Sequence, residues 1–184
     1  MRGYWPILPD LVTFLGSFLP NGMNLIRRRD KAVITARTLH DERDMGGVSA
    51  GAMRVLIADD HDLLRDTLQA FLNAEGGFDA GTVASFDEAV AQVEAGAHYD
   101  LILLDYSMPG MRGLDGLKRM MELAGHKRVA IISGTASREI AEEALAVGAA
   151  GFVPKTLSAK SLINAVRFMA MGEQYAPLEF MRAP

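Results

Sequence analysis

The sequence predicts an α/β fold built on one mainly parallel β-sheet with helices on both faces. From Arg54 onward, short apolar runs bounded by polar turns alternate with longer segments of helical periodicity, which is the pattern of repeated strand-helix units. The runs VLIA, LILL and VAII are apolar at every position, as expected for strands that are covered on both faces. A chain of 184 residues, 49% of them hydrophobic, is sufficient for one core of this kind.

Five strands are expected, each followed by a helix. Parallel neighbours need crossover connections, and these are almost always right-handed, so five such units form a single sheet. The predicted strands cover residues 54–58, 80–84, 100–104, 128–132 and 151–153.

The predicted helices lie between these strands. Four apolar residues share one helical face after the first strand: Leu64, Leu68, Phe71 and Leu72. Ser85, with Glu88 three residues later, predicts a capping box that opens the second helix. Further helices are expected over 114–124, 137–147 and 158–171.

Residues 1–52 differ in composition from the remainder. The small-residue stretch 45–52, MGGVSAGA, separates them from the patterned region, so we expect residues 1–52 to be an extension or linker, poorly ordered or a small appendage. The apolar segment 7–19 is too short to span a bilayer and contains Pro9, Asp10 and Gly16. The basic cluster within 27–31 is interpreted as solvated charge, so no membrane contact is expected.

Composition excludes several classes of function. A formal net charge of −4 and a pI near 5.6 give no general attraction to a polyanion, so we expect no direct nucleic-acid binding by this chain. The absence of cysteine excludes disulfides, thiolate metal sites and a cysteine nucleophile. A cysteine-free chain fits a reducing compartment, and we expect a cytoplasmic location.

Polar residues close the apolar runs. The first run ends in Asp59 and Asp60, the third in Asp105, the fourth in Ser133, and Lys155 follows the fifth. Singly, each has an ordinary explanation as a helix cap, a turn residue or a solvated lysine. Since ligands of such sheets bind at the carboxyl ends of the strands, we interpret the joint placement of these residues as a functional site.

Three carboxylates at one sheet edge repel each other unless a cation compensates them. An all-oxygen set with no histidine or cysteine expected nearby favours Mg²⁺, which commonly bridges carboxylates to a phosphoryl group. Phosphoryl transfer then assigns a role to each residue. Asp105 would be the nucleophile, Lys155 would neutralise charge on the phosphoryl oxygens, and the Ser133 hydroxyl would donate to one of them. His61, beside the acid pair, could approach the metal, but the favoured expectation is that it begins the first helix as a polar or capping residue.

These residues lie in motifs that resemble the receiver domain of bacterial two-component response regulators. The resemblance covers residues 53–172, and its motifs are VLIADDH (55–61), LILLDYSMPGMRGLDGL (101–117), IISGTAS (131–137) and GAAGFVPK (148–155). It implies a flavodoxin-like (βα)5 fold of strand order 2-1-3-4-5 with helices on both faces.

The resemblance also implies a role for each site residue. Asp59, Asp60 and Asp105 would form the Mg²⁺ pocket, the backbone carbonyl of Ser107 would be a further ligand, and Lys155 would pair with the phosphoryl group on Asp105.

A conformational switch is implied for the same domain, with Ser133 as the switch hydroxyl and Phe152 as the switch aromatic. A phosphoryl group with about two negative charges would attract Ser133, and the vacated space would let Phe152 rotate inward. An ordinary core role for Phe152 remains the alternative.

By the same resemblance, the expected phosphoryl donor is a sensor histidine kinase or a histidine phosphotransfer protein. A homodimer that forms on phosphorylation is a second expected contact, and four residues of the last helix serve either that face or the core: Ala165, Val166, Phe168 and Met169.

The sequences GAAGFVPKTLSA (148–159) and NAVRFMAMGEQYAP (164–177) are similar to receivers joined to a LuxR-type helix-turn-helix output domain. Residues 53–172 would be the receiver and residues 173–184 a remnant of the linker, so a truncated regulator is favoured over a stand-alone module.

Two other classes stay open. The first is a haloacid-dehalogenase-like phosphohydrolase, which also combines an aspartate nucleophile, Mg²⁺, a hydroxyl and a lysine. Enzymes of that family resemble one another in a second acid two residues after the nucleophile, where this chain has Ser107. A receiver fold that serves only as a non-phosphorylated docking scaffold is the other. The favoured hypothesis is a signalling phosphoacceptor rather than an enzyme, with chemistry limited to self-phosphorylation and autodephosphorylation.

Overall fold

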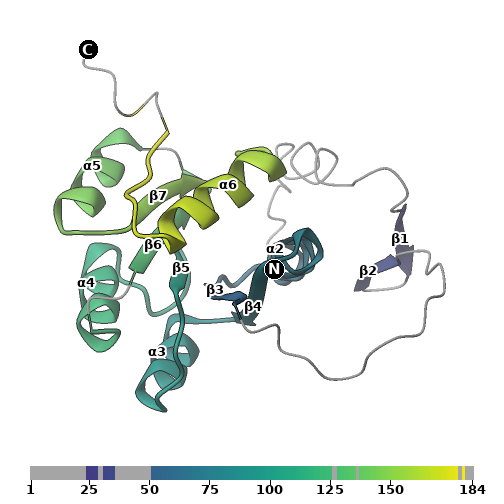
Figure 1. Ribbon diagram of the computed structural model, residues 1–184, viewed down its shortest axis with the longest axis horizontal. Helices are drawn as coiled ribbons and strands as arrows, with labels where there is room; N and C mark the ends of the chain where they lie inside the picture. Colours follow the sequence, from purple (N-terminus) through teal and green to yellow (C-terminus); the bar gives the residue numbers. More distant parts are fainter. Residues whose placement is uncertain are drawn as a thin grey trace, which may run out of the picture.

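The computed structural model describes residues 24–28, 31–35, 51–125, 128–135, 137–177 and 180. Its main feature is a five-stranded sheet of order β4-β3-β5-β6-β7, in which all neighbours are parallel (Figure 1). Counted from β3, this is the order 2-1-3-4-5, so the predicted flavodoxin-like fold is confirmed.

The observed elements lie close to the predicted ones. The strands of the sheet are β3 (Met53–Ala58), β4 (Phe78–Val83), β5 (Leu101–Asp105), β6 (Arg128–Ser133) and β7 (Gly151–Pro154). The helices are α2 (Asp62–Glu75), α3 (Phe86–Glu94), α4 (Leu114–Leu123), α5 (Arg138–Ala146) and α6 (Ala159–Ala170). Every predicted strand overlaps an observed one, because strands buried on both faces carry a continuous apolar signal.

Three helices begin at serines that cap them. Ser85 Oγ accepts a hydrogen bond from the Glu88 backbone N–H at 3.3 Å, and Glu88 Oε2 accepts one from the Ala84 backbone N–H at 2.9 Å. Ser137 and Ser158 cap α5 and α6 in the same way. The helix starts are therefore fixed by local side-chain hydrogen bonds that the sequence shows directly.

The sheet separates two apolar layers (Figure 1). Helices α2 and α6 cover one face through residues such as Leu68 and Val166, whereas α3, α4 and α5 cover the other through residues such as Phe86 and Leu117. Three of the four α6 residues considered for a dimer face, Ala165, Val166 and Met169, lie in the first layer, and Phe168 is 46% exposed. This double packing holds the carboxyl ends of the strands at one edge.

The region before the sheet contains a hairpin that the sequence prediction lacked. Strands β1 (Asn24–Arg28) and β2 (Lys31–Thr35) pair antiparallel, with Ile26 opposite Val33. Segment 7–19, most of the small-residue stretch 45–52 and the side chains of the basic cluster lie outside the described residues. Within the described part of the chain, no helix combines the length and apolarity needed to cross a membrane.

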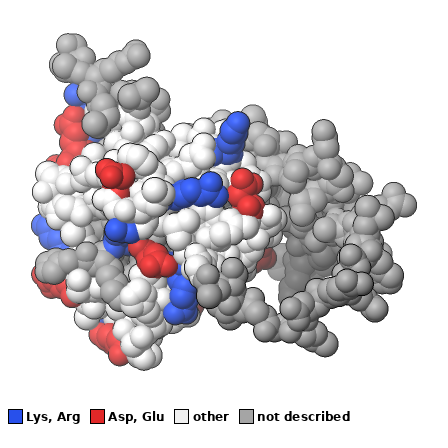
Figure 2. All heavy atoms as spheres, in the orientation of Figure 1, with Lys and Arg blue, Asp and Glu red and all other residues white. Residues whose placement is uncertain are grey.

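Charged side chains of both signs are interspersed over the described part of the face in Figure 2, rather than gathered by sign.

Candidate functional site

The register of the sheet brings the predicted site residues to one edge. Asp59 directly follows β3, Asp105 is the last residue of β5, and Ser133 is the last residue of β6. Asp105 lies opposite Ile132, and Ser133 lies opposite Pro154, so Lys155 follows directly on the neighbouring strand. Parallel pairing therefore converts four distant positions in the sequence into one cluster.

The centre of the cluster is an ion-pair bridge. Asp59 and Asp105 have no exposed surface, and Lys155 Nζ lies 2.8 Å from Asp59 Oδ2 and 3.1 Å from Asp105 Oδ2. Among the described residues, this ammonium is the only partner of those two oxygen atoms. One cation thus compensates two buried carboxylates, which is a costly arrangement unless further positive charge is supplied.

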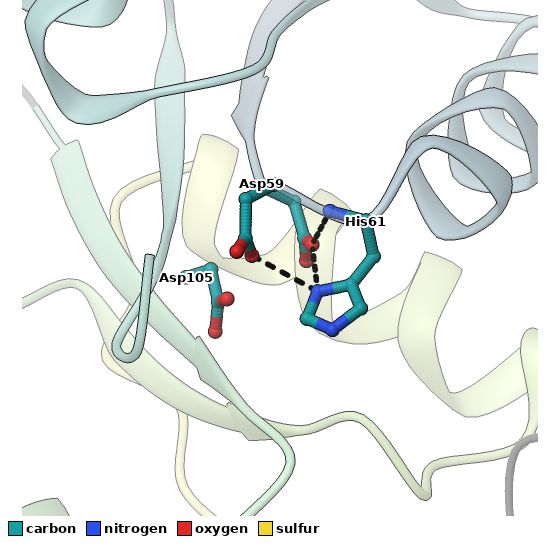
Figure 3. Close-up of side chains that lie close together, drawn as sticks. Asp59, His61 and Asp105 are labelled. Atoms are coloured by element: carbon teal, nitrogen blue, oxygen red, sulfur yellow. Dashed lines mark hydrogen bonds and ion pairs between the residues drawn. The ribbon is translucent and has the colours of Figure 1, made fainter. Parts of the chain in front are cut away.

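Asp60 and His61 extend the cluster toward solvent. His61 Nδ1 lies 3.0 Å from Asp59 Oδ1 and 3.0 Å from Asp60 Oδ1, and Figure 3 shows the ring turned to these carboxylates with Asp105 beside them. His61 does occupy the N-cap position of α2, but its side chain makes no capping hydrogen bond. One ligand atom from each of Asp59, Asp60, His61 and Asp105 lies within 4.8 Å of the others. The prediction that His61 begins α2 is confirmed, and its ring also reaches the acid pair, which was the less favoured expectation. The expectation that no histidine lies near the oxygen donors was wrong.

Backbone contacts fix the two buried carboxylates. Asp59 Oδ1 accepts a hydrogen bond from the His61 backbone N–H at 2.9 Å, and Arg65 Nη1 donates to the Asp59 carbonyl at 2.6 Å. Asp105 Oδ1 accepts a weak one from the Ser107 backbone N–H at 3.4 Å. Sequence reasoning did not identify Arg65, whose only signal was its place one turn into the helix that follows the acid pair.

The pKa of the Asp105 carboxyl is raised above its ordinary value of 3.8. Burial is the largest cause, and the nearby Asp59 charge acts in the same direction, whereas the Lys155 ammonium lowers the pKa. The raised pKa means that the ionised carboxylate is poorly compensated in the protein alone. An added cation would lower the pKa again.

The two predicted switch residues lie on adjacent strands. The buried Ser133 hydroxyl donates to the Thr135 carbonyl at 3.1 Å and accepts from the Thr135 backbone N–H at 3.2 Å. The Phe152 side chain is fully buried in the layer beneath α3, α4 and α5. Ser133 therefore bonds to its own loop, and the Phe152 ring lies inside the core on the neighbouring strand.

The donor set fits a divalent oxygen-binding cation. If all three carboxylates of Asp59, Asp60 and Asp105 are ionised, they face the single charge of Lys155, which leaves the cluster short of two positive charges. Carboxylate oxygens are the ligands that Mg²⁺ prefers. The acidic pocket is thus compatible with Mg²⁺, while a role for the Ser107 carbonyl stays a prediction.

Comparison with known proteins agrees with this geometry. The family profile described as "Response regulator receiver domain" matches residues 55–167, which contain every residue of the cluster. The chain belongs to the response regulator receiver family. Such receivers are parts of two-component systems and are in general signalling proteins rather than enzymes.

Individual relatives place this receiver near the LuxR and NarL branch of the family. The chain is 33% identical over 132 residues to the glycerol metabolism activator of Pseudomonas putida, covering 70% of this chain and 59% of that protein. It matches a LuxR family DNA-binding response regulator from Silicibacter pomeroyi with a TM-score of 0.62 and 35% identity, over 69% of this chain and 98% of that one.

The receiver domain of the putative response regulator NarL from Mycobacterium tuberculosis gives a TM-score of 0.61 at 32% identity, over 66% of this chain and 98% of that one. By contrast, the chain spans little more than half the length of the curated relatives, for example 59% and 60% of two of them.

Proposed function

We propose that this receiver accepts a phosphoryl group on Asp105 from a sensor histidine kinase or a histidine phosphotransfer protein. The observation that carries the proposal is the bridge of Lys155 Nζ to the buried carboxylates of Asp59 and Asp105, at 2.8 Å and 3.1 Å. Such a bridge places a fixed cation where charge develops during phosphoryl transfer. Two buried carboxylates that share one ammonium cost stability, so a purely structural role for Asp105 would not explain the second buried acid beside it.

Mg²⁺ is the proposed cofactor, held by Asp59, Asp60 and Asp105 with the Ser107 carbonyl as a further ligand. When bound, it supplies positive charge to the carboxylates and to the transferring phosphoryl oxygens. His61 contacts two of the proposed ligands through oxygen atoms that the cation would need. His61 therefore has to turn aside, which its 60% exposed side chain has room to do.

The transfer step follows from these positions. An Asp105 carboxylate oxygen attacks the phosphorus atom, a phosphorus–oxygen bond forms, and the phosphorus–nitrogen bond to the donor histidine breaks. Lys155 moves from a carboxylate–carboxylate bridge to a contact with the phosphoryl oxygens. In autodephosphorylation, a water molecule attacks the same phosphorus atom and the carboxylate leaves.

The proposed output is a change at Ser133 and Phe152 that controls transcription or a partner protein. The Ser133 hydroxyl would exchange its hydrogen bond to the Thr135 carbonyl for one to a phosphoryl oxygen. Phosphorylation would favour the buried position of the Phe152 ring on the neighbouring strand. DNA-binding relatives such as the Silicibacter protein support a transcriptional role.

We keep the proposed division into a receiver at 53–172 flanked by an extension at 1–52 and a linker at 173–184. We also keep a phosphorylation-dependent homodimer as a proposed contact, for which the exposed Phe168 on α6 is the remaining support among the residues first considered. The match of residues 55–167 to the receiver family favours this function over a haloacid-dehalogenase-like hydrolase or an unphosphorylated scaffold.

The test is incubation with acetyl phosphate and Mg²⁺, followed by intact mass measurement. We expect the wild type to gain one phosphoryl group and the Asp105→Asn variant to gain none. Absence of an adduct in the wild type, or an adduct that persists in the variant, would contradict the proposal. Turnover of a small phosphomonoester would instead indicate a hydrolase.

A further inference from the structure

The chain that follows α6 returns to the sheet and adds to its edge. The Tyr175 backbone N–H donates to the Ala150 carbonyl at 2.9 Å, and the Phe152 backbone N–H donates to the Tyr175 carbonyl at 2.9 Å. These bonds form a parallel bridge between Gly151 and Tyr175, beyond the last strand of the sheet. We call residues 174–177, together with Phe180, the strap.

The seat of the strap is shaped for close approach. A Cβ atom at Gly151 would lie 2.5 Å from Met169 Sδ and 2.6 Å from the Tyr175 carbonyl oxygen, closer than real Cβ contacts allow. Only glycine therefore admits the strap backbone at this distance. Pro177 is buried, so the strap remains against the protein after the bridge.

The strap also contacts the end of α5. The Gln174 side-chain Nε2 donates to the Leu145 carbonyl at 3.2 Å and to the Ala149 carbonyl at 3.0 Å. These carbonyls belong to the last turn of α5 and to the loop that enters β7, and the Leu145 carbonyl also accepts a bond from the Gly148 backbone N–H at 3.0 Å. A shift of α5 relative to β7 would break one or both bonds.

The ring of Phe180 packs on the proposed switch residue. Its centroid lies 5.8 Å from that of Phe152, with an interplanar angle of 83°, so the two rings meet edge to face. Phe180 is partly buried against the same layer that encloses Phe152. The contact stabilises the inward position of Phe152, and any outward rotation would lose it.

We propose that the strap is a coupling element, in which docking of residues 174–177 and Phe180 on the β7 edge and phosphorylation of Asp105 reinforce each other. This inference rests on the proposed function of Asp105 and Phe152. Both events favour the same inward ring, and binding linkage requires that the effect be reciprocal. The strap would carry the state of the site to the chain that follows it.

The coupling has a limited expected size. An edge-to-face aromatic pair changes an equilibrium constant by a factor of roughly 2 to 12. Loss of the pair should therefore weaken the binding of a phosphoryl analogue by no more than this factor. A strap that only protects an open sheet edge would produce no change at Asp105. The two cases therefore differ in a quantity measured at the distant site.

The experiment compares beryllofluoride affinity, in the presence of Mg²⁺, for the wild type, Phe180→Ala and Phe180→Tyr. Leu123→Ala is the control, because it truncates an apolar side chain at the exposed end of α4, to which neither the site nor the strap assigns a role. We expect Phe180→Ala to bind beryllofluoride several-fold more weakly, Phe180→Tyr to recover most of the affinity, and the control to equal the wild type. Amide hydrogen exchange at Phe152 and Tyr175 should also slow when beryllofluoride binds.

Equal affinity in Phe180→Ala and the control, with exchange at Tyr175 unaffected by beryllofluoride, would overturn the coupling and leave the phosphoacceptor function intact. Failure of the wild type to bind beryllofluoride would overturn both. Circular dichroism of each variant excludes loss of fold as the cause of a weaker affinity.

Discussion

Replacement of Lys155 by methionine tests the compensation of charge at the centre of the site. Methionine keeps the apolar length of the side chain but removes the ammonium that lies 2.8 Å from Asp59 Oδ2 and 3.1 Å from Asp105 Oδ2. Both carboxylates are fully buried, so they cannot recover the lost interaction from water. We therefore expect a large loss of stability when no divalent cation is present.

The magnitude follows from the burial of the pair. Removing one partner of a buried ion pair costs about 3 to 5 kcal/mol, and the 13% exposure of the Lys155 side chain places this case toward the lower end. Because the free energy of unfolding of native domains is about 5 to 15 kcal/mol, the variant should remain folded. Its Tm should fall by roughly 10 to 20 °C.

The loss should depend on pH and on Mg²⁺. Lys155 lowers the pKa of Asp105, so its removal raises that pKa further, and the variant protonates Asp105 at a higher pH than the wild type does. A neutral carboxyl needs no counter-charge, so the difference between variant and wild type should shrink as pH falls and grow as pH rises. Saturating Mg²⁺ should also reduce the difference, because it replaces the lost positive charge.

The assay is urea unfolding in EDTA and in Mg²⁺, with Lys160→Met as the control. Lys160 is an exposed lysine on α6 outside the cluster, and its replacement should change the free energy of unfolding by less than about 0.5 kcal/mol. If Lys155→Met unfolds in EDTA with the same free energy as this control, the reasoning about the buried carboxylates is refuted.

Three further predictions concern neighbouring positions. Metal-free wild type should lose stability as pH rises from 3.8 through the raised pKa of Asp105, and Asp105→Asn should remove this loss and be the more stable protein at neutral pH. The assay is Tm against pH, and the same pH profile in both proteins would argue against the raised pKa. His61→Ala frees oxygen atoms of two proposed ligands and should bind Mg²⁺ a few-fold more tightly by calorimetry, whereas weaker binding would show that the ring assists the cation. Gly116→Ala would place Cβ 1.9 Å from the Met111 carbonyl oxygen and should lower the free energy of unfolding in urea by about 2 kcal/mol or more. A decrease below about 0.5 kcal/mol, the usual range for surface substitutions, would contradict that packing.

The fold could be predicted from sequence because its signals are local. The run LILL is buried at every position, and Ser85 with Glu88 marks the start of α3 through hydrogen bonds within five residues. The convergence of Asp59, Asp105 and Lys155 was also predictable, since parallel strands bring their carboxyl ends to one edge.

Other features depend on side-chain directions and long-range pairing that no short motif contains. The His61 ring turns to two carboxylates instead of capping α2, a choice set by the geometry of the turn after β3. The strap was interpreted only as linker, because Tyr175 pairs with Gly151, which lies 24 positions earlier in the chain, and the segment carries no periodic apolar pattern. The hydrogen bonds of the Ser133 hydroxyl to the Thr135 backbone are likewise not indicated by the sequence.

The central claim is that Asp105, and not one of its acidic neighbours, carries the phosphoryl group. Treatment with acetyl phosphate and Mg²⁺, followed by borohydride reduction, converts an aspartyl phosphate to homoserine, which peptide mass spectrometry locates. We predict homoserine at position 105 alone and only when Mg²⁺ is present. Homoserine at position 59 or 60, or an unmodified chain under these conditions, would contradict the assignment.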